Sequence, residues 1–214
     1  MSAVAHIDEY KTGRFFSDEF RGSLSWNGRE NNVLLRHRGN QLAEDREIPV
    51  FTDVAMALGT DGIRDARGVA ILDIDNDGDL DIAVNHHPGD DGTTTVPALL
   101  YRNNIGQEQN WLAVRLTGTT VNRDAVGAEI RLEAGSLRAM RHVQAGSAYA
   151  GQQTQKLYFG LGAEETVDVL RITWPNGDRQ VLRNLPTRRF LHVIQGQEVQ
   201  FKEPVYPAPR MGGQ

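Results

Sequence analysis

The chain has 214 residues, of which 39% are hydrophobic and 24% charged, and its formal net charge is −5. A chain of this length and composition is expected to fold around a sizeable core. Because it contains no cysteine, disulfides, thiolate zinc sites and cysteine nucleophiles are excluded. No apolar run approaches the roughly 18 residues that a membrane-spanning helix needs.

Charge is unevenly distributed along the chain. Residues 1–110 hold 10 basic and 19 acidic side chains, whereas residues 111–214 hold 13 basic and 9 acidic ones. Five of the acidic side chains lie within nine residues, from Asp73 to Asp81, which indicates a cation site more than a diffuse acidic surface. The sequence contains no stripe of basic residues of the kind that indicates a nucleic-acid partner.

Residues 1–22 mix charged and aromatic side chains without a sustained period, so they are predicted to be an N-terminal arm. This segment lacks the apolar core and cleavage site of a secretory signal, so the chain as written is expected in the cytoplasm. If a signal has been removed, the same sequence would be extracellular.

Short β-like runs separated by turn residues follow from Val33 onward, which predicts an all-β fold. We expect antiparallel sheets that form a β-sandwich or an open barrel. A first unit is predicted over residues 23–105, with strand-like runs at 32–40, 50–59, 68–84 and 98–104.

A second β domain is predicted over residues 110–202, followed by a flexible Pro- and Gly-rich tail at 203–214. Its expected strands lie at 112–116, 128–132, 141–143, 156–159, 167–174 and 190–194, the first two with clean apolar–polar alternation. The apolar phase changes between Val169 and Leu170, which predicts a bulge or a strand buried on both faces. Asn176-Gly177 predicts a tight hairpin with positive φ angles.

The acidic run has the spacing of a calcium loop. Its alternate positions carry carboxylates: Asp73, Asp75, Asp77, Asp79 and Asp81. Gly78 occupies position 6, where the chain must bend, and Asp79 at position 7 is expected to contribute its backbone carbonyl. Ca²⁺ takes six to eight oxygen ligands, and it is preferred to Mg²⁺, which demands stricter octahedral geometry. Calcium is therefore the predicted cofactor.

An EF-hand is excluded, because position 12 of the loop is Val84 rather than glutamate and the flanking runs are predicted strands. Residues 68–84, GVAILDIDNDGDLDIAV, instead resemble the FG-GAP or VCBS calcium repeat found in blades of integrin-type β-propellers.

Residues 110–186 resemble the ASPIC/UnbV domain of the cartilage acidic protein family, in a short bacterial-like form. The motifs that carry this resemblance are Asn122-Arg123-Asp124, Gly127-Ala128, Gly146 with Tyr149, Phe159-Gly160-Leu161-Gly162 and Trp174-Pro175-Asn176-Gly177. The resemblance implies one propeller-blade-like calcium-binding unit followed by a β domain. A single blade cannot close a propeller, so its strands must pair with the second domain or with another copy, as in a homo-oligomer.

Outside the loop, four residues are candidate ligand-binding groups: Asn122, Arg123, Tyr149 and His86. Asn122 and Arg123 either hold a carboxylate or phosphate or merely fix a turn. Tyr149 either supplies a phenol or packs in the core. His86, followed by His87, either belongs to a second metal or acid–base site or lies in a solvated loop.

The function expected from these features is that of a calcium-binding interaction module whose partner is a protein, a glycan or a small-molecule ligand. The alternative is a small calcium-dependent enzyme or accessory protein of specialised metabolism, such as a cyclisation or rearrangement catalyst, because UnbV-type sequences resemble products of natural-product gene clusters. No GxSxG elbow, P-loop, HExxH or dinucleotide fingerprint is present, so the sequence leaves the question of catalysis open.

Overall fold

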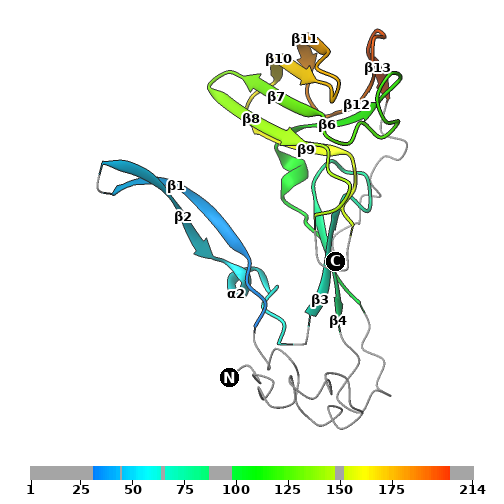
Figure 1. Ribbon diagram of the computed structural model, residues 1–214. Helices are drawn as coiled ribbons and strands as arrows, with labels where there is room; N and C mark the ends of the chain where they lie inside the picture. The colour runs from blue at the N-terminus through cyan, green and yellow to red at the C-terminus, as the bar shows by residue number, and fades with distance from the viewer. Residues whose placement is uncertain (1–30, 44, 64–65, 87–97, 148–151, 203–214) are drawn as a thin grey trace, which may run out of the picture. The chain divides into compact units, whose positions relative to one another are not determined.

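The computed structural model describes residues 31–43, 45–63, 66–86, 98–147 and 152–202 (Figure 1). The predicted N-terminal arm, the predicted tail and the candidate Tyr149 lie outside these residues. The chain divides into two compact units, which are described separately. One comprises residues 1–68 with 84–99, and the other comprises residues 69–83 with 100–214.

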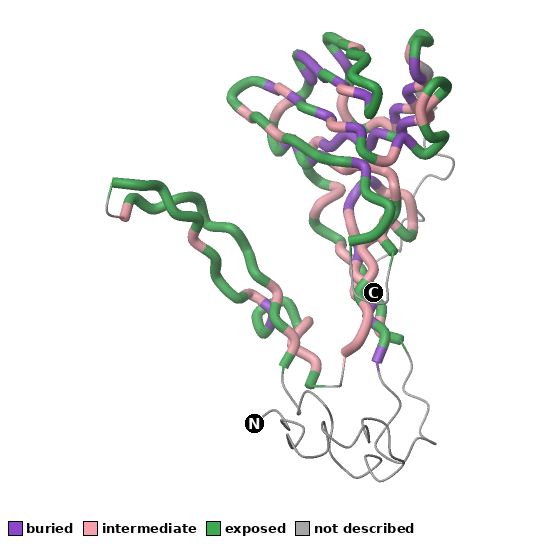
Figure 2. The backbone as a smooth tube through the Cα atoms, in the orientation of Figure 1, coloured by how far each residue is buried: buried purple, intermediate pink, exposed green. Residues whose placement is uncertain are grey.

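The first unit contains an antiparallel hairpin of β1 (Leu35–Ala43) and β2 (Arg46–Asp53), followed by the short helix α2 (Ala55–Leu58). The Asp53 carboxylate accepts a hydrogen bond from the Ala55 backbone N–H at 2.9 Å, and Gly59 ends the helix with a φ of +68°. The hairpin is exposed along almost its whole length (Figure 2).

Strands β3 (Ala66–Leu72), β4 (Asp81–His86) and β5 (Leu99–Tyr101) form a three-stranded sheet in the order β3-β4-β5. The acidic loop therefore connects two neighbouring strands, as the sequence predicted.

The second unit contains two four-stranded sheets. The first has the order β11-β10-β7-β8 and is antiparallel throughout, with bounds β7 (Glu129–Ala134), β8 (Leu137–His142), β10 (Thr166–Thr173) and β11 (Arg179–Pro186). The second has the order β13-β12-β6-β9, with bounds β6 (Asn110–Thr117), β9 (Leu157–Gly162), β12 (Arg189–Ile194) and β13 (Gln200–Lys202). Within the second sheet β6 and β12 run parallel, whereas the other pairs are antiparallel.

Both of these sheets contribute side chains to one buried core, so the prediction of an all-β fold with antiparallel sheets is confirmed. One sheet contributes Leu112, Val114, Phe159, Leu191 and Val193, and the other contributes Ile130, Leu132, Leu170 and Ile172, all less than 2% exposed. Figure 2 shows most of the buried residues, in purple, along the strands of these two sheets. None of the described helices is long and apolar enough to cross a membrane.

The β10–β11 hairpin occurs where Asn176-Gly177 predicted it. The Trp174 backbone donates to the Asp178 carbonyl at 2.9 Å and accepts from the Gly177 N–H at 2.8 Å. Of Asn176 and Gly177, only Gly177 has a positive φ, +90°. The Asn176 side chain accepts a hydrogen bond from the Asp178 N–H. The turn is thus a three-residue loop with glycine at the left-handed position.

Burial on both faces explains the phase change in β10. Val169 is 7% exposed and Leu170 is fully buried, although they point to opposite faces of the strand. The register of β10 with β7 is unshifted across this point, so no bulge lies between these two residues on that side.

Candidate metal centre

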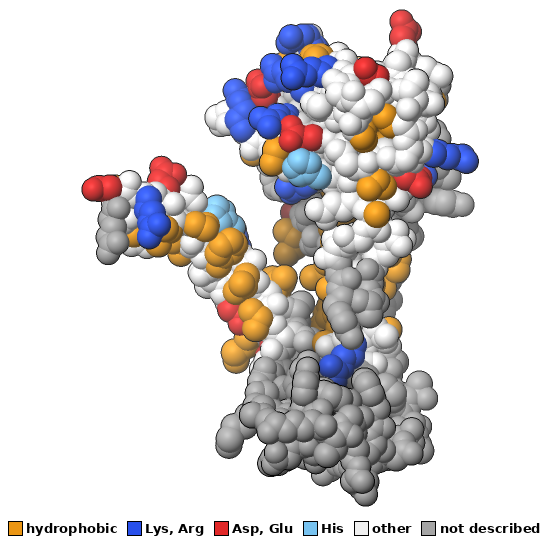
Figure 3. Space-filling view, in the orientation of Figure 1, with side chains coloured by type: hydrophobic (Ala, Val, Ile, Leu, Met, Phe, Trp, Pro, Cys, Tyr) orange, Lys and Arg blue, Asp and Glu red, His pale blue; other side chains and the backbone are white. Residues whose placement is uncertain are grey.

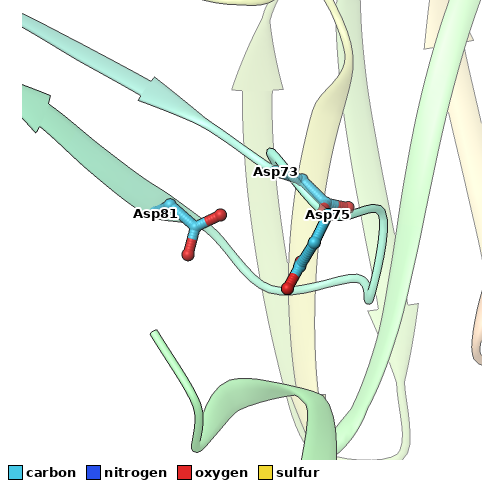
Figure 4. A group of neighbouring side chains, drawn as sticks. All are labelled: Asp73, Asp75 and Asp81. Atoms are coloured by element: carbon cyan, nitrogen blue, oxygen red, sulfur yellow. The ribbon is translucent and has the colours of Figure 1, made fainter. Parts of the chain in front are cut away.

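Three carboxylates converge in the loop between β3 and β4. Asp73 follows the last residue of β3, Asp75 lies in the loop, and Asp81 opens β4 (Figure 4). Ligand oxygens of these three residues lie within 4.8 Å of one another. Oxygens at such separations can share one cation.

Backbone N–H groups fix two of these carboxylates. Asp73 accepts from the Asp77 and Gly78 N–H groups, each at 3.1 Å. Asp81, 1% exposed, accepts from the Ile74 N–H at 3.0 Å and from the Asn103 N–H at 2.8 Å. The loop geometry therefore holds these oxygens in place before any metal is added.

Glycine is required at the bend for two reasons. Gly78 has a φ of +97°, which an L side chain rarely adopts. In addition, a Cβ atom at Gly78 would lie 1.8 Å from the indole of Trp111 on β6. The backbone of the acidic loop thus packs directly against a strand of the β13-β12-β6-β9 sheet.

Tyr158 on β9 makes a second link to that sheet. Its hydroxyl donates to Asp73 Oδ2 at 3.2 Å. Burial, followed by the charge of Asp73, raises the pKa of Tyr158, so the phenol remains a hydrogen-bond donor. The ring of Phe190 on β12 contacts both aromatic residues, with its centroid 5.0 Å from that of Trp111 and 6.5 Å from that of Tyr158.

The other two predicted aspartates are arranged differently. Asp79 is 6% exposed, and its Oδ2 accepts from the Gln107 N–H at 3.1 Å. The Cβ atom of Asp79 also lies close to Gly106, because a Cβ atom added at Gly106 would be only 2.5 Å from it. Asp77 Oδ1 accepts from the Asp79 N–H at 3.1 Å. Neither carboxylate belongs to the converging group of three.

Burial disfavours the charges of this loop. Burial is the largest cause of the raised pKa of Asp73, Asp77 and Asp79, and neighbouring aspartates raise all three pKa values further. The pKa of Asp79 rises to about 6. One cation of the protein compensates in part, because the Arg102 guanidinium lies 2.6 Å from Asp75 Oδ2.

The donor set fits a hard cation. Among the described residues, Asp75 Oδ1, Asp77 Oδ2 and Asp79 Oδ1 are buried without a hydrogen-bond donor. Buried carboxylate oxygens without a partner are costly, and an oxygen-seeking divalent ion would satisfy those that face it.

The remaining candidates lie elsewhere. The Asn122 amide closes its own loop, accepting from the Val126 N–H at 2.8 Å and donating to the Val126 carbonyl at 2.9 Å. Arg123 is exposed, and its carbonyl accepts from the Gly118 N–H. His86, the last residue of β4, is 5% exposed, and within the described part of the chain neither ring nitrogen has a hydrogen-bond partner. A ligand-binding role for these residues stays a prediction.

Residues 118–200 match the family described as ASPIC and UnbV. The chain carries an ASPIC and UnbV domain. The matched range includes β7 to β12, and therefore the whole of one sheet and part of the other. The resemblance of residues 68–84 to an FG-GAP or VCBS repeat lies outside that range and stays a prediction.

Curated relatives agree with this assignment. Human cartilage acidic protein 1 is 31% identical over 164 residues, which are 76% of this chain and 22% of the relative. Its counterpart from Xenopus tropicalis is 33% identical over 116 residues, which are 53% of this chain and 17% of that protein. The chain thus spans about a fifth of the length of these relatives.

Proposed function

We propose that this chain is an interaction module whose ASPIC and UnbV domain is stabilised by Ca²⁺ in the loop from Asp73 to Asp81. The observation that carries the proposal is the convergence of Asp73, Asp75 and Asp81 within 4.8 Å. The proposed shell adds Asp77 and the backbone carbonyl of Asp79, which gives five oxygens when each residue supplies one, and a bidentate carboxylate or a water would complete the six to eight that calcium takes.

The role proposed for the ion is to stabilise the packing of the loop against the neighbouring sheet. The loop contacts the β13-β12-β6-β9 sheet through Trp111 and Tyr158. A cation that offsets the repulsion among the loop carboxylates would stabilise these contacts as well. The ion would thereby hold the FG-GAP-like loop and the ASPIC and UnbV sheets in one stable unit.

An interaction role is supported by the family to which the domain belongs. Relatives named for cartilage favour the extracellular of the two settings that the sequence left open. The proposal is accordingly a calcium-stabilised β domain that presents an exposed surface to a partner.

Thermal unfolding with calcium and with a chelator tests the proposal. At a free calcium concentration of about 100 times Kd, binding should add about 2.7 kcal/mol. For a chain of this size, that corresponds to a rise in Tm of about 5 to 11 °C. An unchanged Tm would contradict the proposed metal site.

Asp75→Asn keeps the size of the side chain but removes a charge from the loop, so it should abolish most of the calcium-dependent rise in Tm. The matched control is Asp124→Asn, because Asp124 is an exposed aspartate in a different loop of the same unit. Equal loss of the calcium response in both variants would indicate a general charge effect and would overturn the assignment.

A further inference from the structure

One face of the β11-β10-β7-β8 sheet carries a cluster of cations. Strand register places three rows side by side on this face: Arg183–Val169–Glu133–Arg138, Val181–Arg171–Arg131–Met140 and Arg179–Thr173–Glu129–His142. We call these twelve residues the arginine face, after its five arginines: Arg131, Arg138, Arg171, Arg179 and Arg183.

The arginine face points away from the core. The alternate residues of the same strands, such as Leu132, Leu170 and Ile172, are at most 1% exposed. By contrast, the side chains of Arg131 and Arg138 are 64% and 60% exposed. Figure 3 shows Lys and Arg side chains gathered over β7, β8, β10 and β11.

The charges on this face are only partly balanced. Glu133 lies between Arg171, with which it forms a close ion pair, and Arg138, whose Nη2 is 3.9 Å from Glu133 Oε2. Glu129 pairs with Arg131, and its Oε2 lies 3.8 Å from His142 Nε2. Five arginines and two glutamates leave a net charge of +3 with a neutral histidine. Among the described residues, Arg179 and Arg183 form no ion pair.

We infer that the arginine face binds a linear sulfated polysaccharide. The guanidinium group offers paired N–H donors that match sulfate and carboxylate oxygens. Neighbouring strands are about 4.8 Å apart, so four strands spread the cations over about 14 Å. An extended chain with repeated anionic groups can contact several of them at once.

The composition of the face disfavours an acidic protein as the partner. Protein interfaces usually contain an apolar centre with aromatic anchors. On the arginine face the two exposed apolar side chains, Met140 and Val181, stand on the outermost strands and are separated by Arg171 and Arg131. Charged groups therefore occupy the centre, where a protein partner would need apolar contacts.

Nucleic acids fit the face less well. Single strands are bound by sheets that present large aromatic side chains for base stacking, and the arginine face carries no Phe, Tyr or Trp. Duplex readers insert a helix or ribbon into a groove, whereas these cations lie on the surface of a sheet. A polysaccharide needs neither feature.

This inference deepens the proposed function by naming the partner class, and it rests on the chain being an interaction module. It does not depend on the metal, because none of its residues contacts the loop from Asp73 to Asp81 in the interactions described above. The calcium proposal can therefore fail while the polysaccharide site holds, and measuring binding with calcium and with a chelator separates the two.

The test is the affinity of the full chain for heparin, a sulfated polysaccharide, measured by calorimetry at physiological salt. Arg179→Ala with Arg183→Ala should weaken binding about fivefold or more, because two unpaired contacts are lost. The matched control, Arg38→Ala with Arg115→Ala, removes the same charge from exposed positions outside the face and should change the affinity less than twofold.

Glu133→Gln supplies a variant whose effect misfolding cannot imitate. Removing this negative charge frees Arg171 and Arg138 for the ligand, so heparin should bind about twofold more tightly. Binding should also weaken as salt is raised.

Three results would overturn the inference: equal losses in the two arginine pairs, poly-glutamate bound as tightly as heparin, or duplex DNA bound as tightly as heparin. Retained heparin binding in the presence of chelator, together with an unchanged Tm on adding calcium, would refute the metal site and support the arginine face.

Discussion

Gly78→Ala should destabilise the second unit through two separable effects. The φ of +97° at this residue is unfavourable for an L side chain, which costs about 1 to 2 kcal/mol. The new methyl group would also lie 1.8 Å from the Trp111 indole, and overpacking of this kind costs about 1 to 3 kcal/mol. The free energy of unfolding should therefore fall by about 2 to 5 kcal/mol.

Gly177→Ala isolates the backbone effect. Its φ is +90°, close to that of Gly78, and nothing lies within 4 Å of a Cβ built there. Both glycines belong to the same compact unit, so the two variants report on the same unfolding transition. The control should cost only about 1 to 2 kcal/mol.

Urea unfolding monitored by far-UV circular dichroism measures both costs. In a Trp111→Ala background, the extra cost of Gly78→Ala over Gly177→Ala should disappear, since the contact that it overpacks is gone. If the two glycine variants are equally destabilised in the wild-type background, the described packing of the acidic loop against β6 is wrong.

Two further predictions concern buried polar groups. The pKa of Asp79 is raised from 3.8 to about 6, so stability due to its protonation is present below pH 3.8 and lost as the pH rises through about 6. In the presence of chelator, urea unfolding should therefore show that Asp79 contributes about 1 kcal/mol more to the free energy of unfolding at pH 5 than at pH 7. If Asp79→Asn shows the same pH dependence as the wild type, the raised pKa of Asp79 is contradicted. Gln195 is 5% exposed, accepts from the Thr119 and Thr120 N–H groups and donates to Asp178. Gln195→Ala should lower the free energy of unfolding, measured in urea, by about 2 to 4 kcal/mol. The control Gln197→Ala, at an exposed position, should lower it by about 0.5 kcal/mol or less. Similar values for the two variants would refute the stabilising role of the Gln195 amide.

Local patterns predicted much of this fold. Alternating apolar residues identified β6 and β7, and Asn176-Gly177 identified the β10–β11 turn. These signals are legible because side-chain period and turn chemistry act over a few residues.

Strand β11 was missed, because its sequence does not alternate cleanly. Val181 and Leu182 are adjacent apolar residues, and Asn184 is of a residue type common in turns, so the sequence of this run resembles a loop. In the structure Asn184 has a φ of +53°. Pairing with β10 stabilises the strand in spite of these residues.

Sequence patterns also could not predict which side chains surround the acidic loop. Tyr158 lies 85 positions from Asp73, with which it shares a hydrogen bond, and nothing in the spacing of residues 156–159 points to the loop. The arginine face could not be predicted for the same reason, since its cations come from four strands and are brought together only by the register of the sheet.

The position of β6 determines how this protein can be dissected. β6 lies between β12 and β9 in its sheet, yet it precedes the matched range of 118–200. A fragment cloned to those limits would lack the strand that joins β12 to β9, and both would expose unpaired edges that favour aggregation. Expression trials of the isolated domain should accordingly begin before Asn110, and those meant to retain the Trp111 contact should begin before Val69.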